Sequence, residues 1–349
     1  MLLTLLLLCS GLRPQQDPAD HVLLVINQPS VESTEVGAYY RSKRGIAREN
    51  VVFVDVSRTE EVTNSEYRSA IEEPVRKAVK GSKTRIDYIV LTKGIPIRIA
   101  LSGLSVDSML AAMDLKFEPI TKPTEAEIKR AINPYFGKNE PFDSKKFGYY
   151  LVTRLDGFTV ADAKALVDNS LAAKPAKGPF FFDEADNRKA DGYGEIQKTL
   201  GAAVSVLTKK GLEATVDKTA AFVVPGSPLM GYASWGSNDS GFSWQAYRKI
   251  KFLPGSICET FVSTSGRSFA PTATGSGQSL IGDLIANGVT GIKGYVSEPF
   301  TFALARPEVL FDRYTSGRNL AESFYAASLV LKWKDIVIGD PLCSPYAKP

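Results

Sequence analysis

The sequence predicts an α/β fold with a mostly parallel central sheet, and two observations support this class. Short apolar runs recur along the chain, and helical patterns with capping residues and terminal glycines alternate with them. The first run, residues 21–26, is apolar throughout after its histidine, which is typical of a strand covered on both faces. With 349 residues, 44% of them hydrophobic, the chain can bury a large core.

Nine apolar runs are expected to form the strands, because each has the length and the side chains that buried strands favour. In chain order they cover residues 22–26, 51–56, 87–92, 149–155, 179–182, 229–234, 257–262, 290–296 and 335–338.

Helices are expected between these strands. Ser33 is expected to cap the first helix and Gly45 to close it, and Pro74 is expected to kink the second. Ser279 is the expected cap of the helix before the strand at 290–296. The segment 116–146 is polar, lacks periodicity and contains four prolines, so we expect a surface excursion that lies over the site as a flap.

The N-terminus predicts export. Residues 1–11 form an apolar run that is too short to span a bilayer and lies where a secretory signal has its apolar core. We predict a signal peptide and linker over 1–20, and a location in the periplasm or outside the cell. A single domain is expected over 21–349, with 21–175 and 176–349 as candidate halves. No later segment has the length and apolarity of a membrane span.

The charge content bears on the expected binding partners, and the cysteine content bears on disulfide bonding. The chain has 42 basic and 38 acidic residues with no long run of one sign, so nucleic acid is not an expected partner. After the leader only Cys258 and Cys343 remain. Two buried structural thiols are the favoured interpretation, and a single disulfide is the alternative.

Two motifs follow neighbouring predicted strands, where open α/β sheets bind ligands. Trp235, Gly236 and Ser237 come after the strand at 229–234, and the Ser263-Thr-Ser-Gly266 motif comes after the strand at 257–262. These motifs resemble the two active-site loops of caspase-like cysteine peptidases of the gingipain and legumain kind. The resemblance implies a caspase-like three-layer α/β sandwich.

In that family the first loop carries a catalytic His and the second a catalytic Cys. Here those positions hold Trp235 and Ser263. An indole cannot exchange a proton near neutral pH, so the resemblance implies a peptidase fold without its dyad. We therefore predict a pseudopeptidase that binds a peptide or glycan, without cofactor or metal. The predicted pocket residues are Trp235, Gly236, Ser237, Ser263, Ser265, Gly266, Arg267, Asp107 and Arg154, with Arg267 and Asp107 at the rim.

Three observations bear on alternatives. Ser263 would be the catalytic nucleophile of a hydrolase if Lys93 or Lys293 served as its base. The acidic turn at 183–186 could bind a hard cation, but such turns are more often solvated. The only histidine, His21, is expected to be a solvated or capping residue at the domain edge.

Further motifs widen the resemblance, among them residues 88–96, 105–108, 154–157, 232–238, 263–269 and 338–341. They are similar to those of an uncharacterised family of exported bacterial proteins that co-occurs with exosortase, the system that sorts proteins with a PEP-type signal. That resemblance covers nearly all of the mature chain. It implies a role at the cell envelope, with a structural part in surface-polymer or exopolysaccharide assembly as a further alternative.

Overall fold

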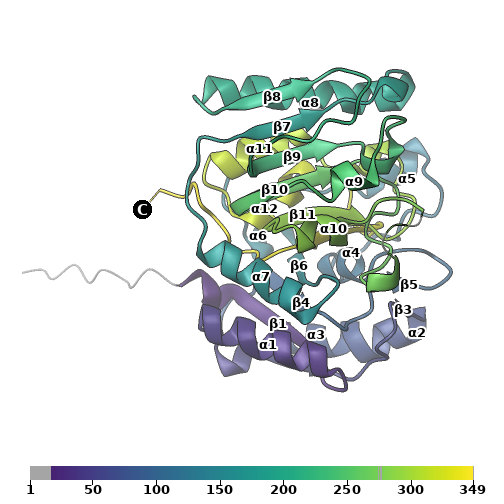
Figure 1. Ribbon diagram of the computed structural model, residues 1–349. Helices are drawn as coiled ribbons and strands as arrows, with labels where there is room; N and C mark the ends of the chain where they lie inside the picture. The colour runs from purple at the N-terminus through teal and green to yellow at the C-terminus, as the bar shows by residue number, and fades with distance from the viewer. Residues whose placement is uncertain (1–16, 274, 276, 349) are drawn as a thin grey trace, which may run out of the picture.

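The computed structural model describes residues 17–273, 275 and 277–348, and a ten-stranded sheet forms its centre. The strands lie in the order β2-β1-β4-β6-β12-β11-β10-β9-β7-β8. In Figure 1 the early strands β1 and β4 lie at one end of the molecule, and β7 and β8 lie at the other. Each of the nine predicted strands is present, and the α/β class is confirmed.

The pairing is parallel from β2 to β6 and again from β11 to β8, whereas β12 runs antiparallel to β11 and meets β6 at the single pair Ile338–Arg154. The bounds are β1 Val22–Asn27, β2 Val51–Val54, β4 Tyr88–Thr92, β6 Leu151–Leu155, β7 Phe180–Asp183, β8 Ala214–Asp217, β9 Leu229–Ser234, β10 Phe252–Thr260, β11 Gly291–Tyr295 and β12 Asp335–Ile338. A separate pair is formed by β3 Glu61–Val62 and β5 Arg98–Ile99.

Helices cover both faces of the sheet, which gives the three layers expected of a caspase-like sandwich. One face carries α1 Val31–Arg44, α7 Val160–Leu171 and α10 Ile281–Ala286, and the other carries α3 Glu73–Gly81, α4 Val106–Ala111, α8 Asp191–Lys209, α11 Pro307–Thr315 and α12 Leu320–Ala327. Shorter helices are α2 Asn64–Glu66, α5 Glu125–Arg130, α6 Ser144–Phe147 and α9 Trp244–Tyr247.

Large apolar side chains hold α11 against the second half of the sheet. Phe180 and Phe182 on β7 contact Phe311 of α11, with ring centroids 5.9 Å and 5.0 Å apart. The neighbouring position on β9 is Gly231, where a Cβ atom would lie 2.3 Å from Phe180 and 2.6 Å from Phe311. Glycine is therefore required there for close packing. One apolar cluster runs through both halves of the sheet.

Three local predictions need correction or detail. Ser30 caps α1, because Ser33 instead accepts a hydrogen bond from the backbone N–H of Asn27 at 2.7 Å. Pro74 does not kink a continuous helix: a π-helical turn over residues 67–72 comes before it and α3 begins at residue 73. Ser279 does not cap α10, whose cap position is Leu280.

Candidate binding site

Loops after four strands of the second half surround a hollow of about 250 Å³, which we call the Trp235 hollow. Arg188 and Tyr193 follow β7, Trp235 follows β9 and Ser263 follows β10. Residues 298–301 and 304, after β11, form the remaining wall. The structure thus brings Trp235 and Ser263 to one hollow at the carboxyl edge of the sheet, where ligands of such folds bind.

Trp235 is a wall of the hollow but not an open stacking surface. Its side chain is only 1% exposed, and its indole N–H donates to Gln197 Oε1 at 2.8 Å. The rings of Tyr193 and Phe261 pack edge-on against it, with centroids 5.8 Å and 5.0 Å away, and the Arg188 guanidinium lies 5.5 Å from its centre. The indole therefore shapes and supports the hollow, and the surface in reach of a ligand belongs to its neighbours.

Two aromatic side chains present that surface. Tyr193 is 45% exposed and Phe300 is 43% exposed, and both line the hollow. The guanidinium of Arg188 lies over the Tyr193 ring, 4.8 Å from its centroid, and Arg188 Nε donates to Asn238 O. Glu298 adds an exposed carboxylate to the lining. Sequence reasoning missed these four residues, because the loops after β7 and β11 and the first turn of α8 carry no motif.

Ser263 is half-buried at the hollow, and in the described part of the chain it has no hydrogen bond to a basic side chain. The ammonium of Lys93 instead contacts Gly157 O at 2.8 Å and Asp156 Oδ1 at 3.3 Å. Lys293 is fully buried and contacts Ser328 Oγ at 2.7 Å. Neither lysine lines the Trp235 hollow.

The other predicted residues of the two motifs do not line the hollow, and they shape its loops instead. Gly236 has φ +47°, and a Cβ atom there would lie 2.8 Å from Ser279 Oγ. Ser237 N–H donates to the same oxygen at 3.2 Å, so the Ser279 hydroxyl holds this loop, and the cap position of α10 falls one residue later, at Leu280. The N–H of Gly266 donates to Tyr295 O, and the carbonyl of Ser265 accepts from Ile281 N–H.

Three predicted pocket residues lie away from the hollow, so the placement of Asp107 and Arg267 at its rim is wrong. Arg154 and Asp107 are fully buried, with Arg154 Nη2 2.6 Å from Asp107 Oδ1. This ion pair joins β6 to α4 inside the fold. Arg267 Nη1 donates to the carbonyls of Thr264 and Gln278 and so braces its own loop.

The segment 116–146 contributes no residue to the lining of the Trp235 hollow, so the predicted flap over the site is also wrong. It packs instead against the chain before β12. The ammonium of Lys332 donates to Leu115 O and Phe117 O, and Asn133 N–H donates to Leu329 O.

A buried acid supports the wall after β11. Glu259 of β10 is fully buried and accepts a hydrogen bond from the Tyr295 hydroxyl at 2.8 Å. Burial raises the pKa of Glu259 to about 8, although the nearby Lys293 opposes this rise. The Tyr295 oxygen in turn accepts from the Ala305 N–H, next to the wall residue Leu304.

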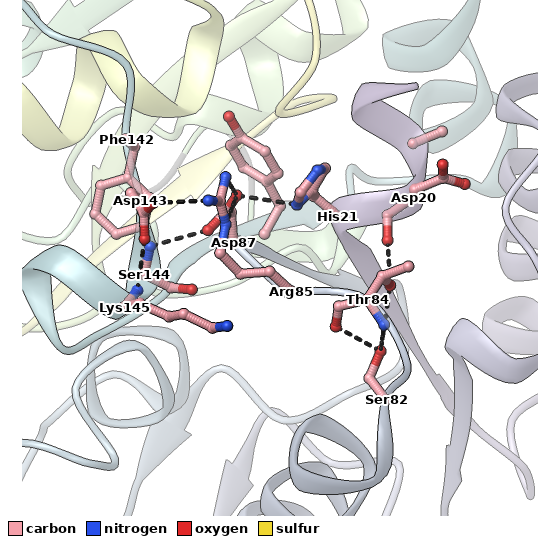
Figure 2. Close-up of polar contacts among 12 residues, drawn as sticks. Asp20, His21, Ser82, Thr84, Arg85, Asp87, Phe142, Asp143, Ser144 and Lys145 are labelled. Atoms are coloured by element: carbon pink, nitrogen blue, oxygen red, sulfur yellow. Dashed lines mark hydrogen bonds and ion pairs between the residues drawn. The ribbon is translucent and has the colours of Figure 1, made fainter. Parts of the chain in front are cut away.

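His21 has partners that the sequence did not suggest, and they lie at the end of the sheet where β1 and β4 begin (Figure 2). Its Nδ1 lies 3.2 Å from Asp87 Oδ2, and Asp87 also accepts from Arg85 Nη2 at 2.8 Å. Arg85 Nη1 reaches Asp143 Oδ2 at 2.6 Å. These contacts join β1, β4 and α6, so the interpretation of His21 as a solvated residue is wrong.

We expect His21→Gln to reduce the pH dependence of stability. The carboxylate of Asp87, 3.2 Å from Nδ1, raises the pKa of His21 above its ordinary value. Protonated His21 therefore stabilises the fold below about pH 6.5, and this contribution is lost as the pH rises through the folded-state pKa. Urea midpoints measured near about pH 6 and about pH 8 should differ more for the natural protein than for the variant. An equal difference in both proteins would contradict this ion pair.

Both described cysteines, Cys258 and Cys343, are buried and unpaired, which confirms that they are buried thiols. Burial raises the pKa of Cys258 well above its ordinary value and that of Cys343 to about 11. We expect neither to react with iodoacetamide in the folded protein, and both to react in urea. Peptide mapping measures the labelling of Cys258 and of Cys343 separately from that of Cys9. Fast labelling of Cys258 in the folded protein would refute the prediction.

The acidic side chains of the turn at 183–186 differ in burial and in their partners. Glu184 lies 3.6 Å from Lys218 Nζ, and Asp186 pairs with Lys189. Asp183 is buried, and burial together with Asp239 and Asp217 raises its pKa to about 8. Within the described residues no cluster of three or more His, Cys, Asp or Glu side chains could hold a metal ion.

Comparison with known proteins supports the fold class. No protein-family model and no curated protein matches the chain. A solved structure titled "Structure of Protease" superposes with a TM-score of 0.50 at 10% identity, over 96% of this chain and 80% of the other. At this identity the likeness shows the fold alone, and the fold is protease-like. Over the described residues no helix is long and apolar enough to cross a membrane.

Proposed function

We propose that this chain is a pseudopeptidase that binds peptides in the Trp235 hollow at the cell envelope without cleaving them. The observation that carries the proposal is the contacts made by the residues at the two positions that hold the catalytic dyad in caspase-like peptidases. Trp235 is locked by Gln197 and by two aromatic rings, and Ser263 has no basic partner among the described residues. A serine hydroxyl needs an adjacent base to act as a nucleophile, so the hollow has the form of a binding surface.

The chemistry of the hollow favours a peptide over a glycan or a polymer subunit. Tyr193 and Phe300 offer apolar ring faces to an aliphatic or aromatic side chain. Arg188 and Glu298 place one charge of each sign near those faces, and these charges can pair with charged side chains or end groups of a peptide. Export rests on the apolar run at 1–11 and on the family resemblance; the run lies outside the described residues.

Retention of peptides from a defined synthetic library tests the proposal. The natural protein should retain a subset of peptides, and Tyr193→Ala should lower their affinity by about tenfold or more, because it removes a central aromatic anchor. Phe53→Ala is the matched control, since Phe53 is also an exposed aromatic residue but lies on β2. Equal losses in both variants, or no retained peptide, would refute peptide binding in this hollow.

A serine hydrolase is the second candidate, because Ser263 does line the hollow and is half-buried there. Reaction with a fluorophosphonate probe separates the two functions. The pseudopeptidase proposal predicts no adduct on Ser263, whereas an adduct that disappears in Ser263→Ala would establish the hydrolase.

A further inference from the structure

A second hollow, of about 480 Å³, lies at the carboxyl edge of the first half of the sheet, and we call it the Lys93 hollow. Glu32 reaches it from the start of α1, Lys93 from the end of β4, and Asp156 from the end of β6. Residues 269–271, after β10, close one side.

The position of this hollow is that of a ligand site. The strand β2, which follows β1 in sequence, lies on one side of β1, and β4 lies on its other side. The strand order therefore reverses between β1 and β4. Open α/β sheets bind ligands in the crevice at such a switch point, outside the carboxyl ends of the strands. The volume also falls in the range of small-molecule pockets.

A buried cation forms part of the lining. Lys93 is only 8% exposed, and its ammonium contacts Gly157 O at 2.8 Å and Asp156 Oδ1 at 3.3 Å. An ammonium has three donors, so these two oxygens leave one N–H for a ligand. Asp156 also lies 3.6 Å from Arg154 Nη1, and Arg154 in turn pairs with Asp107, so these two cations and two carboxylates form one buried network.

The rest of the lining combines two acids, the exposed guanidinium of Arg58 and apolar walls. Glu32 is exposed at the mouth, and Glu60 holds the closing loop by accepting hydrogen bonds from Ser268 Oγ and the Phe269 N–H. The walls are apolar and comprise Ile95, Ile97, Phe158 and Phe269. A ligand here meets a cation, a carboxylate and apolar surface together.

From this arrangement we infer that the Lys93 hollow binds a free apolar α-amino acid. Its carboxylate accepts the remaining N–H of Lys93, its ammonium lies towards Glu32, and its side chain packs against the apolar walls. Opposite charges on one small ligand match opposite charges in the lining, which neither a simple acid nor a simple amine does.

Isothermal titration with three probes tests this assignment: L-phenylalanine, 3-phenylpropionate, which lacks the amine, and phenethylamine, which lacks the carboxylate. Phenylalanine should bind about tenfold or more tightly than either analogue, because each lost charged hydrogen bond costs at least that much. Lys93→Met should bring phenylalanine and phenethylamine to equal affinity. Phenethylamine binding as tightly as phenylalanine to the natural protein, or no binding of phenylalanine, would overturn the assignment.

Two further variants keep the test decisive. Glu32→Gln is an exposed change that should leave the fold intact and weaken phenylalanine and phenethylamine, but not 3-phenylpropionate. Lys332→Met is the matched control, since Lys332 is also 8% exposed and donates to two backbone carbonyls elsewhere. Tyr193→Ala should leave phenylalanine binding unchanged, so failure here is distinguishable from failure of peptide binding in the Trp235 hollow.

Discussion

Replacing Arg154 by methionine is expected to lower the free energy of unfolding by about 3–5 kcal/mol, because it removes one partner of a buried ion pair. The guanidinium is fully buried, and it contacts Asp107 at 2.6 Å and 3.2 Å. It also donates to the carbonyls of Ile95 at 2.6 Å and Pro96 at 3.0 Å. Methionine fills much of the space but leaves Asp107 charged and unpaired. Urea unfolding followed by circular dichroism measures the loss.

Two controls accompany this variant. Lys198→Gln removes an ion pair with Glu195 on the exposed face of α8 and should leave the urea midpoint unchanged. Adding Asp107→Asn to Arg154→Met should recover part of the loss, because it removes the uncompensated charge. An Arg154→Met midpoint equal to that of the natural protein would contradict a structural role for this pair.

Trp235→Ala is expected to cost about 3–5 kcal/mol of stability, as large-to-small changes of fully buried aromatic residues do. The change opens a cavity beneath Tyr193, removes the ring contact with Phe261 and leaves Gln197 without the indole N–H. Peptide affinity should fall as well, because Tyr193 loses its support. Differential scanning calorimetry provides the measurement.

Trp244 supplies the matched control for that variant. It is only half-buried on α9, so Trp244→Ala should lower the melting temperature clearly less than Trp235→Ala does. Equal losses would show that the indole of Trp235 is not the buried support seen here.

The sequence predicted the fold better than the site. Unbroken apolar runs such as β1 and β4 have all their residues buried, so periodicity and length were enough to find them. The edge strand β8, Ala214–Asp217, was missed because it is only four residues long and those residues are partly exposed and partly polar. The π-helical turn before Pro74 was missed because no sequence pattern distinguishes it from an ordinary helix.

The candidate site was predictable only where a motif marked it. Trp235 and Ser263 directly follow buried strands, and this placed them at one edge of the sheet. Arg154 and Asp107 stand among apolar residues, and a charge at such a place needs a partner. Which way they point depends on packing between β6 and α4, and no local pattern encodes that. Tyr193 was missed because it lies in the first turn of α8, and no motif marks it.

Mass spectrometry of peptides held by the natural protein after prolonged incubation tests the proposed binding role most directly. The account predicts that retained peptides keep the masses with which they were loaded, and that Ser263→Ala retains the same set. New peptide ends that form with the natural protein and disappear with Ser263→Ala would contradict it, because the Trp235 hollow would then be a working hydrolase site.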